Sequence, residues 1–146
     1  MKVLAAALLL LPWGIHGRIS PYILNNTVVA WDANANGQIC TPDITFCDAK
    51  MTYALDTKHC FINTGGIIFP AENGDYDCRN CQDGDQWATF QCDCNIFDNG
   101  SRKSIGFLDK RASALSPITF QYDNVTRAMV PGCFKYNAKL VAVQQK

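Results

Sequence analysis

Cysteine placement constrains this chain more than any other feature, because four of the eight cysteines lie in one short segment, Cys78–Cys94. From Ala88 onward, apolar and polar residues alternate with the two-residue period of a half-buried β-strand. Asp83-Gly84-Asp85, just before it, predicts a turn. Sulfur atoms this close in sequence favour several cross-links to neighbouring strands. We therefore expect a disulfide-stapled β-edge that stabilises the fold and has no obvious catalytic role.

The full set of cysteines indicates an oxidising compartment. An even number implies four disulfide bonds and no free thiol, although spacing alone does not choose among the possible pairings. A zinc site built from Cys78-x-x-Cys81 and Cys92-x-Cys94 is the alternative, but thiols of exported proteins are normally oxidised. The expected disulfide partners are Cys40, Cys47, Cys60, Cys78, Cys81, Cys92, Cys94 and Cys133.

The N-terminus has the three parts of a secretory signal peptide. Lys2 supplies a positive charge, residues 3–11 form an apolar run, and the small residue Gly17 ends the segment. The apolar run is too short to cross a bilayer, and no later segment is apolar enough to do so. We expect residues 1–17 to be removed, leaving residues 18–146 as a single secreted, extracellular domain without membrane insertion.

Residue patterns along the mature chain predict an all-β fold. The expected strands include Tyr22–Trp31, Lys50–Asp56, Ser104–Leu108, Ile118–Tyr122 and Phe134–Leu140. Thr64-Gly65-Gly66 and Asp98-Asn99-Gly100 predict hairpin turns. Helical periodicity is short throughout, although residues 42–50 are compatible with a short helix. We expect a disulfide-stapled antiparallel β-sandwich or barrel of about eight short strands.

Oxygen-bearing side chains alternate after the first expected strand and partly match the calcium loop of EF-hand or dockerin modules. The candidate ligands are Asp32, Asn34, Asn36 and Asp43. The segment before them is typical of a strand and not of a helix, and the second copy usual in such modules is absent. An Asx-rich turn is therefore the competing interpretation. We expect neither a bound metal nor a cofactor.

Residue types limit the catalytic classes open to the mature chain. His59 is its only histidine, which excludes two-histidine ribonucleases and histidine-rich zinc hydrolases. It lies beside Cys60 without a Gly-x-Ser-x-Gly motif to accompany it, which favours a structural role. Acidic residues between Asp75 and Asp93 leave a hydrolase with paired carboxylates open. Because clustered acids in turns are typically solvated, we assign no catalytic residue.

Three Asn-x-Ser/Thr sequons predict N-glycosylation near strand ends. The acceptor residues are Asn25, Asn99 and Asn124. Asn99 belongs to an expected hairpin turn, and we therefore expect it to be the most accessible of the three.

Lys110 and Arg111 form a dibasic pair followed by small residues. Secretory-pathway endoproteases cut such pairs where the loop is exposed, and the alternative is ordinary surface charge. Cys133 is the only cysteine beyond the pair. A cut there would therefore leave the C-terminal segment joined to the body through one disulfide.

Several segments together resemble small secreted cysteine-rich proteins of filamentous fungi. They are Val28-Val29-Ala30-Trp31-Asp32-Ala33, Cys47 with Lys50-Met51-Thr52-Tyr53-Ala54-Leu55, then Cys60, Cys78 and Trp87-Ala88-Thr89-Phe90. Within that group, the chain most resembles the β-proteins related to the Alternaria major allergen. This resemblance implies an effector- or allergen-like β-protein without established catalytic residues.

A second resemblance involves the cysteine-rich segment. Cys78-Arg79-Asn80 and Cys92, followed by Asn99-Gly100 and Ser104-Ile105, are similar to one half of a cyanovirin-type lectin. The cyanovirin fold needs two such halves, and only one is visible here. This resemblance implies carbohydrate binding.

These observations lead to a functional expectation. We expect a non-enzymatic secreted protein that binds a host protein or glycan, or a cell-wall component. The alternatives are a small hydrolase using paired carboxylates and a carbohydrate-binding, lectin-like module. The chain has 13 Lys and Arg against 13 Asp and Glu, and this balance gives no reason to expect binding to nucleic acid.

Overall fold

The computed structural model describes residues 20–34, 49–97 and 100–144. These residues form twelve antiparallel strands and one short 3₁₀ helix, η1 (Thr57–His59). The strands lie in four sheets that do not close into a barrel. No helix in these ranges is long and apolar enough to span a membrane. The all-β, antiparallel, disulfide-stapled class expected from the sequence is confirmed.

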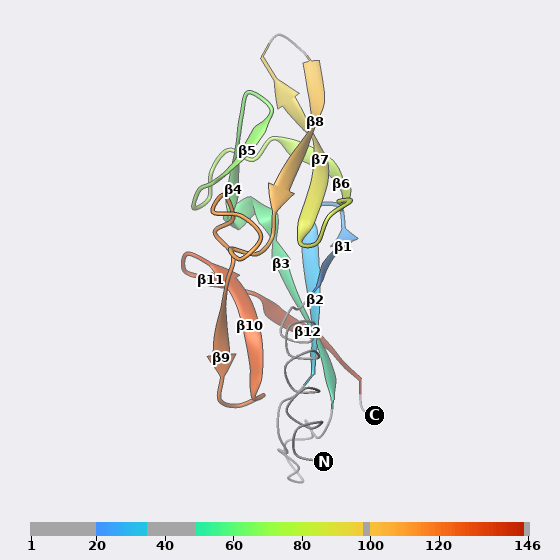
Figure 1. Ribbon diagram of the computed structural model, residues 1–146, viewed down its shortest axis with the longest axis vertical. Coiled ribbons are helices and arrows are strands. Elements are labelled where there is room, and N and C mark those ends of the chain that lie inside the picture. The colour runs from blue at the N-terminus through green and yellow to red at the C-terminus, as the bar shows by residue number, and fades with distance from the viewer. Residues whose placement is uncertain (1–19, 35–48, 98–99, 145–146) are drawn as a thin grey trace, which may run out of the picture.

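The lower half of the elongated molecule contains two facing sheets (Figure 1). One has the order β1-β2-β3-β12 and the other β11-β10-β9. Their strands are β1 (Pro21–Asn25), β2 (Val28–Asn34), β3 (Lys50–Asp56), β9 (Thr119–Asp123), β10 (Ala128–Cys133), β11 (Tyr136–Asn137) and β12 (Lys139–Gln144). The buried Trp31 meets Phe120 of the facing sheet edge-on, with ring centroids 6.4 Å apart.

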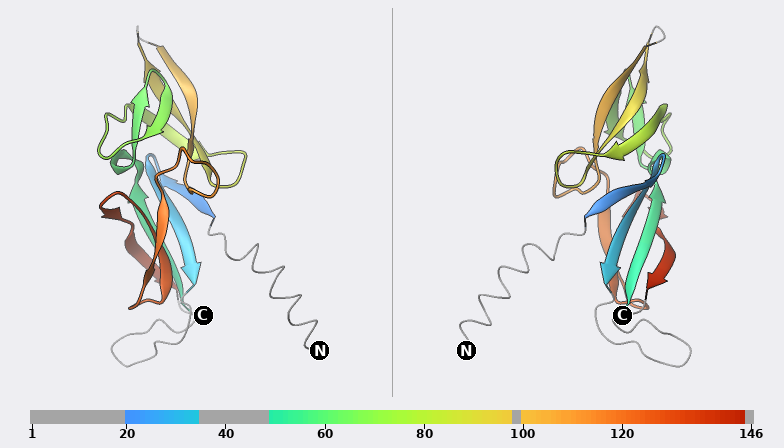
Figure 2. Two further views of the ribbon diagram at one scale, coloured as in Figure 1. Left: turned by 60° about the vertical axis from the view of Figure 1, so that its left-hand side comes forward. Right: turned by 90° about the vertical axis from the view of Figure 1, so that its right-hand side faces the viewer.

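The upper half pairs a hairpin with a three-stranded sheet, as Figure 2 shows from two further sides. The hairpin comprises β4 (Phe61–Thr64) and β5 (Ile67–Pro70). The sheet has the order β6-β7-β8, with β6 (Cys78–Asp83), β7 (Thr89–Ile96) and β8 (Gly100–Phe107). Phe61 packs between them, 5.5 Å from the Phe90 ring centroid and 6.3 Å from that of Tyr76.

Three disulfides connect the six cysteines of the described ranges. Cys78–Cys94 and Cys81–Cys92 both join β6 to β7. Cys60–Cys133 joins residues 73 positions apart and links the start of β4 to β10. The staple around Cys78–Cys94 is thus local to that segment, and the zinc interpretation is wrong because its four sulfurs are bonded in pairs. Cys40 and Cys47 lie outside the described residues, so the fourth disulfide stays a prediction.

Two strand predictions needed correction near positive φ angles. The expected strand Tyr22–Trp31 is a hairpin of β1 and β2, because Asn26 has φ 51° and asparagine tolerates this left-handed conformation. The expected strand Phe134–Leu140 begins too early, since Phe134 has φ 53° in the turn between β10 and β11, and the remainder is divided between β11 and β12. A chain reversal divides the first pattern, and a turn takes the place of the start of the second.

The sequence also failed to predict two strands. β6 was not among the expected strands, and it contains a register shift between Arg79 and Gln82. β10 contains Pro131 and Gly132, which normally disfavour strands. Cys–Cys bonds fix both strands to partners, so tertiary constraints outweigh local preference here.

Tyr76 is buried under the two local disulfides, with its hydroxyl 3.2 Å from Cys92 Sγ. Burial raises the pKa of Tyr76 well above its usual value. The unfolded tyrosine ionises near pH 10, so its neutral folded form contributes stability that is lost as pH rises above about 10.

We expect Tyr76→Phe to reduce this loss of stability at alkaline pH, measured as urea midpoints over a pH series. Tyr122→Phe, at an exposed site, is the control, and equal slopes for both variants would contradict the assignment.

Candidate functional site

Two of the acidic residues between Asp75 and Asp93 accept hydrogen bonds at the surface. Asp83 Oδ1 accepts the Ile23 amide at 2.6 Å, and Asp77 Oδ2 accepts Asn95 Nδ2 at 2.6 Å. Three hollows formed by described residues have at most one aspartate in their lining. None of these three hollows is lined by a pair of carboxylates.

His59 lies in η1 and connects the two halves of the molecule. Its ring stacks on Tyr136 with centroids 4.2 Å apart, and its Nδ1 lies 3.0 Å from Asn73 Oδ1. Asn73 also donates through Nδ2 to the Tyr136 hydroxyl. His59 is adjacent in sequence to Cys60, and Tyr136 follows Cys133 by three residues, so the stacked pair lies close in sequence to the Cys60–Cys133 disulfide. These contacts support the structural role expected for this histidine.

Two of the four calcium-loop candidates lie in the described part of the chain, so the calcium loop stays untested. Asp32 belongs to β2, and its Oδ1 accepts hydrogen bonds from Tyr22 (3.0 Å) and Thr52 (2.8 Å). Asn34 ends the same strand, while Asn36 and Asp43 lie outside the described residues. No group of three His, Cys, Asp or Glu side chains suited to a metal occurs within the described ranges.

The glycosylation candidates sit at surface turns where they are described. Asn25 and Asn124 are exposed. The hydroxyls of their sequon threonines are directed inward, with Thr27 Oγ1 3.0 Å from Asp56 Oδ1 and Thr126 Oγ1 2.9 Å from Asp123 Oδ2. Asn99 lies outside the described residues, and glycosylation at all three positions stays a prediction.

The two residues of the dibasic pair, Lys110 and Arg111, differ in their contacts. Both residues are exposed, but Arg111 also forms a bidentate ion pair with the buried Asp109, with Nη2 2.7 Å from Oδ2. This hydrogen bonding raises the pKa of Arg111. A protease acting here would have to extract Arg111 from that contact. Cys133 is bonded to Cys60, so a cut chain would stay joined, as the sequence predicted.

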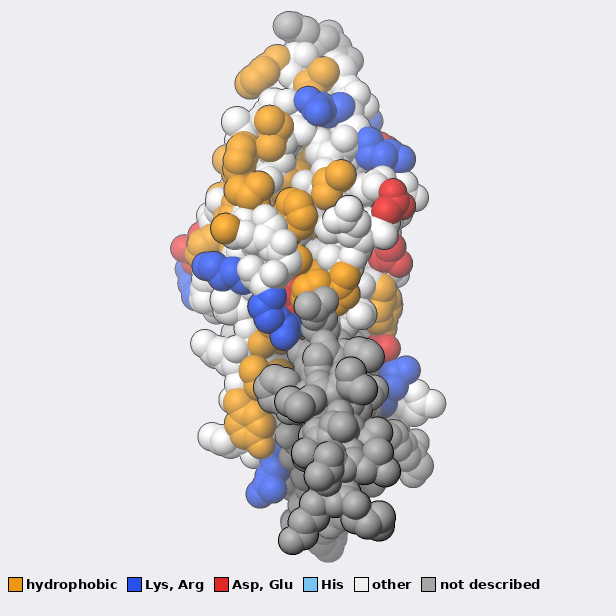
Figure 3. All heavy atoms as spheres, in the orientation of Figure 1, with side chains coloured by type: hydrophobic (Ala, Val, Ile, Leu, Met, Phe, Trp, Pro, Cys, Tyr) orange, Lys and Arg blue, Asp and Glu red, His pale blue; other side chains and the backbone are white. Residues whose placement is uncertain are grey.

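Exposed apolar residues lie where the β4–β5 hairpin meets the end of the β7–β8 hairpin. We call this region the hairpin-end surface and define it by Ile67, Phe69, Ile96 and Phe97. Their exposed fractions are 48%, 36%, 36% and 80%. Figure 3 shows hydrophobic side chains gathered over β5 in this part of the molecule. Apolar side chains gathered in this way commonly mark interaction sites.

A two-glycine turn allows the two hairpins to meet so closely. Gly65 and Gly66 both have positive φ, 59° and 87°, which suits a tight hairpin turn. A Cβ on Gly66 would lie 2.6 Å from Ile96 and 2.5 Å from the Arg102 side chain, so there is no room for one. A Cβ on Gly65 would lie 3.4 Å from the Phe97 ring. The glycines therefore bring the apolar residues of both hairpins onto one surface.

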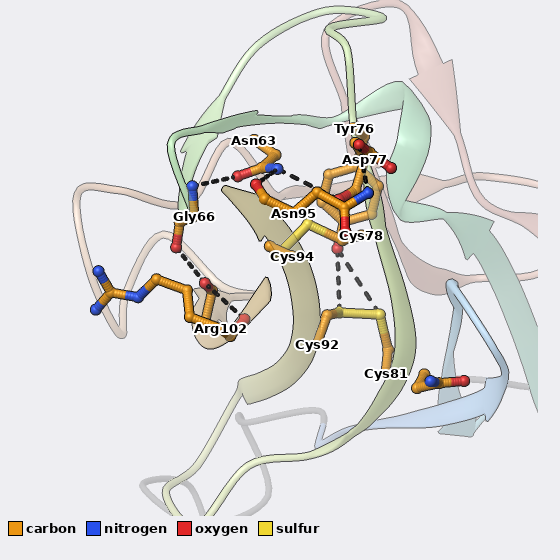
Figure 4. The surroundings of a disulfide bond; sticks show 12 residues. Asn63, Gly66, Tyr76, Asp77, Cys78, Cys81, Cys92, Cys94, Asn95 and Arg102 are labelled. Atoms are coloured by element: carbon orange, nitrogen blue, oxygen red, sulfur yellow. Dashed lines mark hydrogen bonds between the residues drawn. A yellow bond between two sulfur atoms is a disulfide. The ribbon is translucent and has the colours of Figure 1, made fainter. Parts of the chain in front are cut away.

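Hydrogen bonds join the turn of the β4–β5 hairpin to β7, β8 and the segment before β6. Asn63 accepts the Gly66 amide at 2.8 Å through Oδ1 and donates through Nδ2 to the carbonyls of Asn95 (2.7 Å) and Asp77 (3.2 Å). Ser104 Oγ donates to the Gly66 carbonyl from β8. Figure 4 shows this network beside the two local disulfides, with the Arg102 guanidinium directed away from them. These contacts link the β4–β5 hairpin to β7 and β8.

Sequence reasoning missed the hairpin-end surface, although it predicted both turns. Ile67-Ile68-Phe69 has apolar residues on both faces of a short strand. Only Ile68 enters the core, so this run was the available signal for a strand that also presents an apolar outer face.

Comparisons with known proteins do not assign this chain to a family. The three disulfides of the described ranges are typical of extracellular proteins. The fold and the hairpin-end surface are therefore the basis for assigning a function. No known protein family, curated protein or solved structure matches this chain.

Proposed function

We propose that this is a secreted, non-enzymatic binding protein that docks through the hairpin-end surface onto an apolar patch of a protein on a host cell or in a cell wall. The observation that carries the proposal is the exposure of four large apolar side chains on a surface fixed by hydrogen bonds and disulfides. A rigid apolar surface loses little conformational entropy on docking, which favours affinity.

The chemistry of this surface favours a protein partner over a glycan. Isoleucine and phenylalanine bury apolar area, and aromatic anchors near an interface centre often dominate the binding energy. Asn63 is already committed to three contacts within the protein. Sugar hydroxyls would find few polar partners on the four defining side chains. The lectin-like alternative therefore has less support at this position.

Replacing two anchors tests the proposal. We expect Ile67→Thr/Phe97→Ser to bind labelled host cells or isolated walls at least tenfold more weakly than the parent protein, because each anchor contributes about 1 to 2 kcal/mol. Val141→Thr/Val143→Thr changes two exposed apolar residues on β12 and is the matched control. Circular dichroism and intact disulfides would establish that both variants fold.

The outcomes separate the partner classes. Binding that is lost after protease treatment of the cell surface supports a protein partner. Binding that survives protease and is competed by free sugars supports the lectin-like alternative. An equal loss of binding in the hairpin variant and the β12 variant would contradict the proposal. Asn99→Gln should be included because a glycan there would lie two residues from Phe97 in sequence and could block docking.

A further inference from the structure

A hollow of about 300 Å³ lies in the lower half, separate from the hairpin-end surface. Its lining includes Lys110, Arg111, Ile118, Phe120 and Met129. The loop after β8 supplies the two basic residues, while β9 and β10 supply Phe120 and Met129. Its volume reaches the lower end of the range common for small-molecule sites. The hollow therefore combines cations with an apolar wall at a size suited to a small ligand.

The charge of the hollow is positive once its internal ion pair is counted. Asp109 is 2% exposed and accepts Arg111 Nε at 3.1 Å and Nη2 at 2.7 Å. That pair neutralises the one carboxylate in the lining. Lys110 makes no ion pair with any residue of the described ranges. Its ammonium is the group that can attract an anion.

The apolar wall is firm on one side and adaptable on the other. Ile118 is fully buried, and Phe120 is fixed between Trp31 and the Arg111 guanidinium, which lies 5.6 Å from the Phe120 ring centroid. Met129 is 41% exposed, and its unbranched thioether side chain can adapt to different ligand shapes. This wall suits an aliphatic or aromatic body better than a sugar.

We propose that this hollow binds a small amphipathic carboxylate, with the carboxylate at Lys110 and the apolar body against Phe120 and Met129. The inference rests on the complementarity of charge and apolar surface at one place. It is independent of docking through the hairpin-end surface, because the two regions share no defining residue. Either could fail without affecting the other.

Decanoate and decanol are the probes, since they share an alkyl chain and differ in head-group charge. Titrated into the isotopically labelled full mature protein, decanoate is expected to shift the amide resonances of Lys110, Phe120 and Met129. Lys110→Gln should weaken decanoate binding about fivefold, the effect of losing one partly exposed ion pair, and leave decanol unchanged. Lys103→Gln, an exposed lysine on β8, is the matched control.

A second variant tests the site independently of Lys110. Met129→Asp adds a negative charge to an exposed lining position and should abolish decanoate binding while the protein stays folded. Several results would overturn the inference: no binding at millimolar decanoate, equal affinity for decanoate and decanol, or shifts confined to Ile67, Phe69, Ile96 and Phe97. A response of Lys103→Gln equal to that of Lys110→Gln would also do so.

Discussion

Removing the Cys60–Cys133 disulfide is expected to lower the free energy of unfolding by about 4 kcal/mol. This bond closes a span of 73 residues, and the entropy that a cross-link removes from the unfolded chain grows with loop length. Domains of this size are stable by roughly 5 to 15 kcal/mol, so the loss is a large fraction of the total. The oxidised Cys60→Ala/Cys133→Ala variant should show it in urea titrations.

The local Cys81–Cys92 pair is the matched control because its cysteines are also buried but only 11 residues apart. Cys81→Ala/Cys92→Ala should cost about 3 kcal/mol, less than the long-range pair. If removing the local pair costs as much stability or more, loop closure is not the main contribution of Cys60–Cys133.

Thiol titration of the denatured parent protein, without reductant, would test the fourth disulfide, since Cys40 and Cys47 should then be unreactive.

Alternation in the sequence predicted strands well where one face meets the core. Lys50–Asp56 matches β3 because Met51, Tyr53 and Leu55 are buried in turn. The same reasoning located β7, whose Phe90, Cys92 and Cys94 face inward. The Thr64-Gly65-Gly66 turn was also correct, since two glycines with positive φ permit it. Period and turn chemistry are local properties, so the sequence shows them directly.

The candidate sites depended on contacts that local patterns do not contain. Asn63 looks like an ordinary polar residue in a strand, yet it joins the β4–β5 hairpin to residues 14 and 32 positions away. Arg111 looked like one half of a dibasic pair, and its contact with buried Asp109 became visible only in the structure. Both roles arise from chain segments brought together by folding, which explains why composition and spacing could not assign them.

The Asp109–Arg111 pair leads to the second large expected effect. Arg111→Met removes the guanidinium and leaves a carboxylate that is 2% exposed, with the amide of residue 111 at 2.8 Å as a remaining donor. Leaving a buried charge without its partner is costly, and we expect a loss of about 3 kcal/mol in the free energy of unfolding. Urea titration at neutral pH measures it.

A double-mutant cycle separates the charge effect from lost packing against Trp87 and Phe120, whose ring centroids each lie 5.6 Å from the Arg111 guanidinium carbon. Asp109→Asn/Arg111→Met should recover part of the loss because no buried charge remains. Lys110→Met, at the exposed neighbour, should change stability by less than about 0.5 kcal/mol. If Arg111→Met has an equally small effect, the pair is an ordinary surface contact. Arg111 would then be available to a dibasic endoprotease. The parent protein should in that case be cut after the pair, and the Arg111→Met variant should resist cleavage.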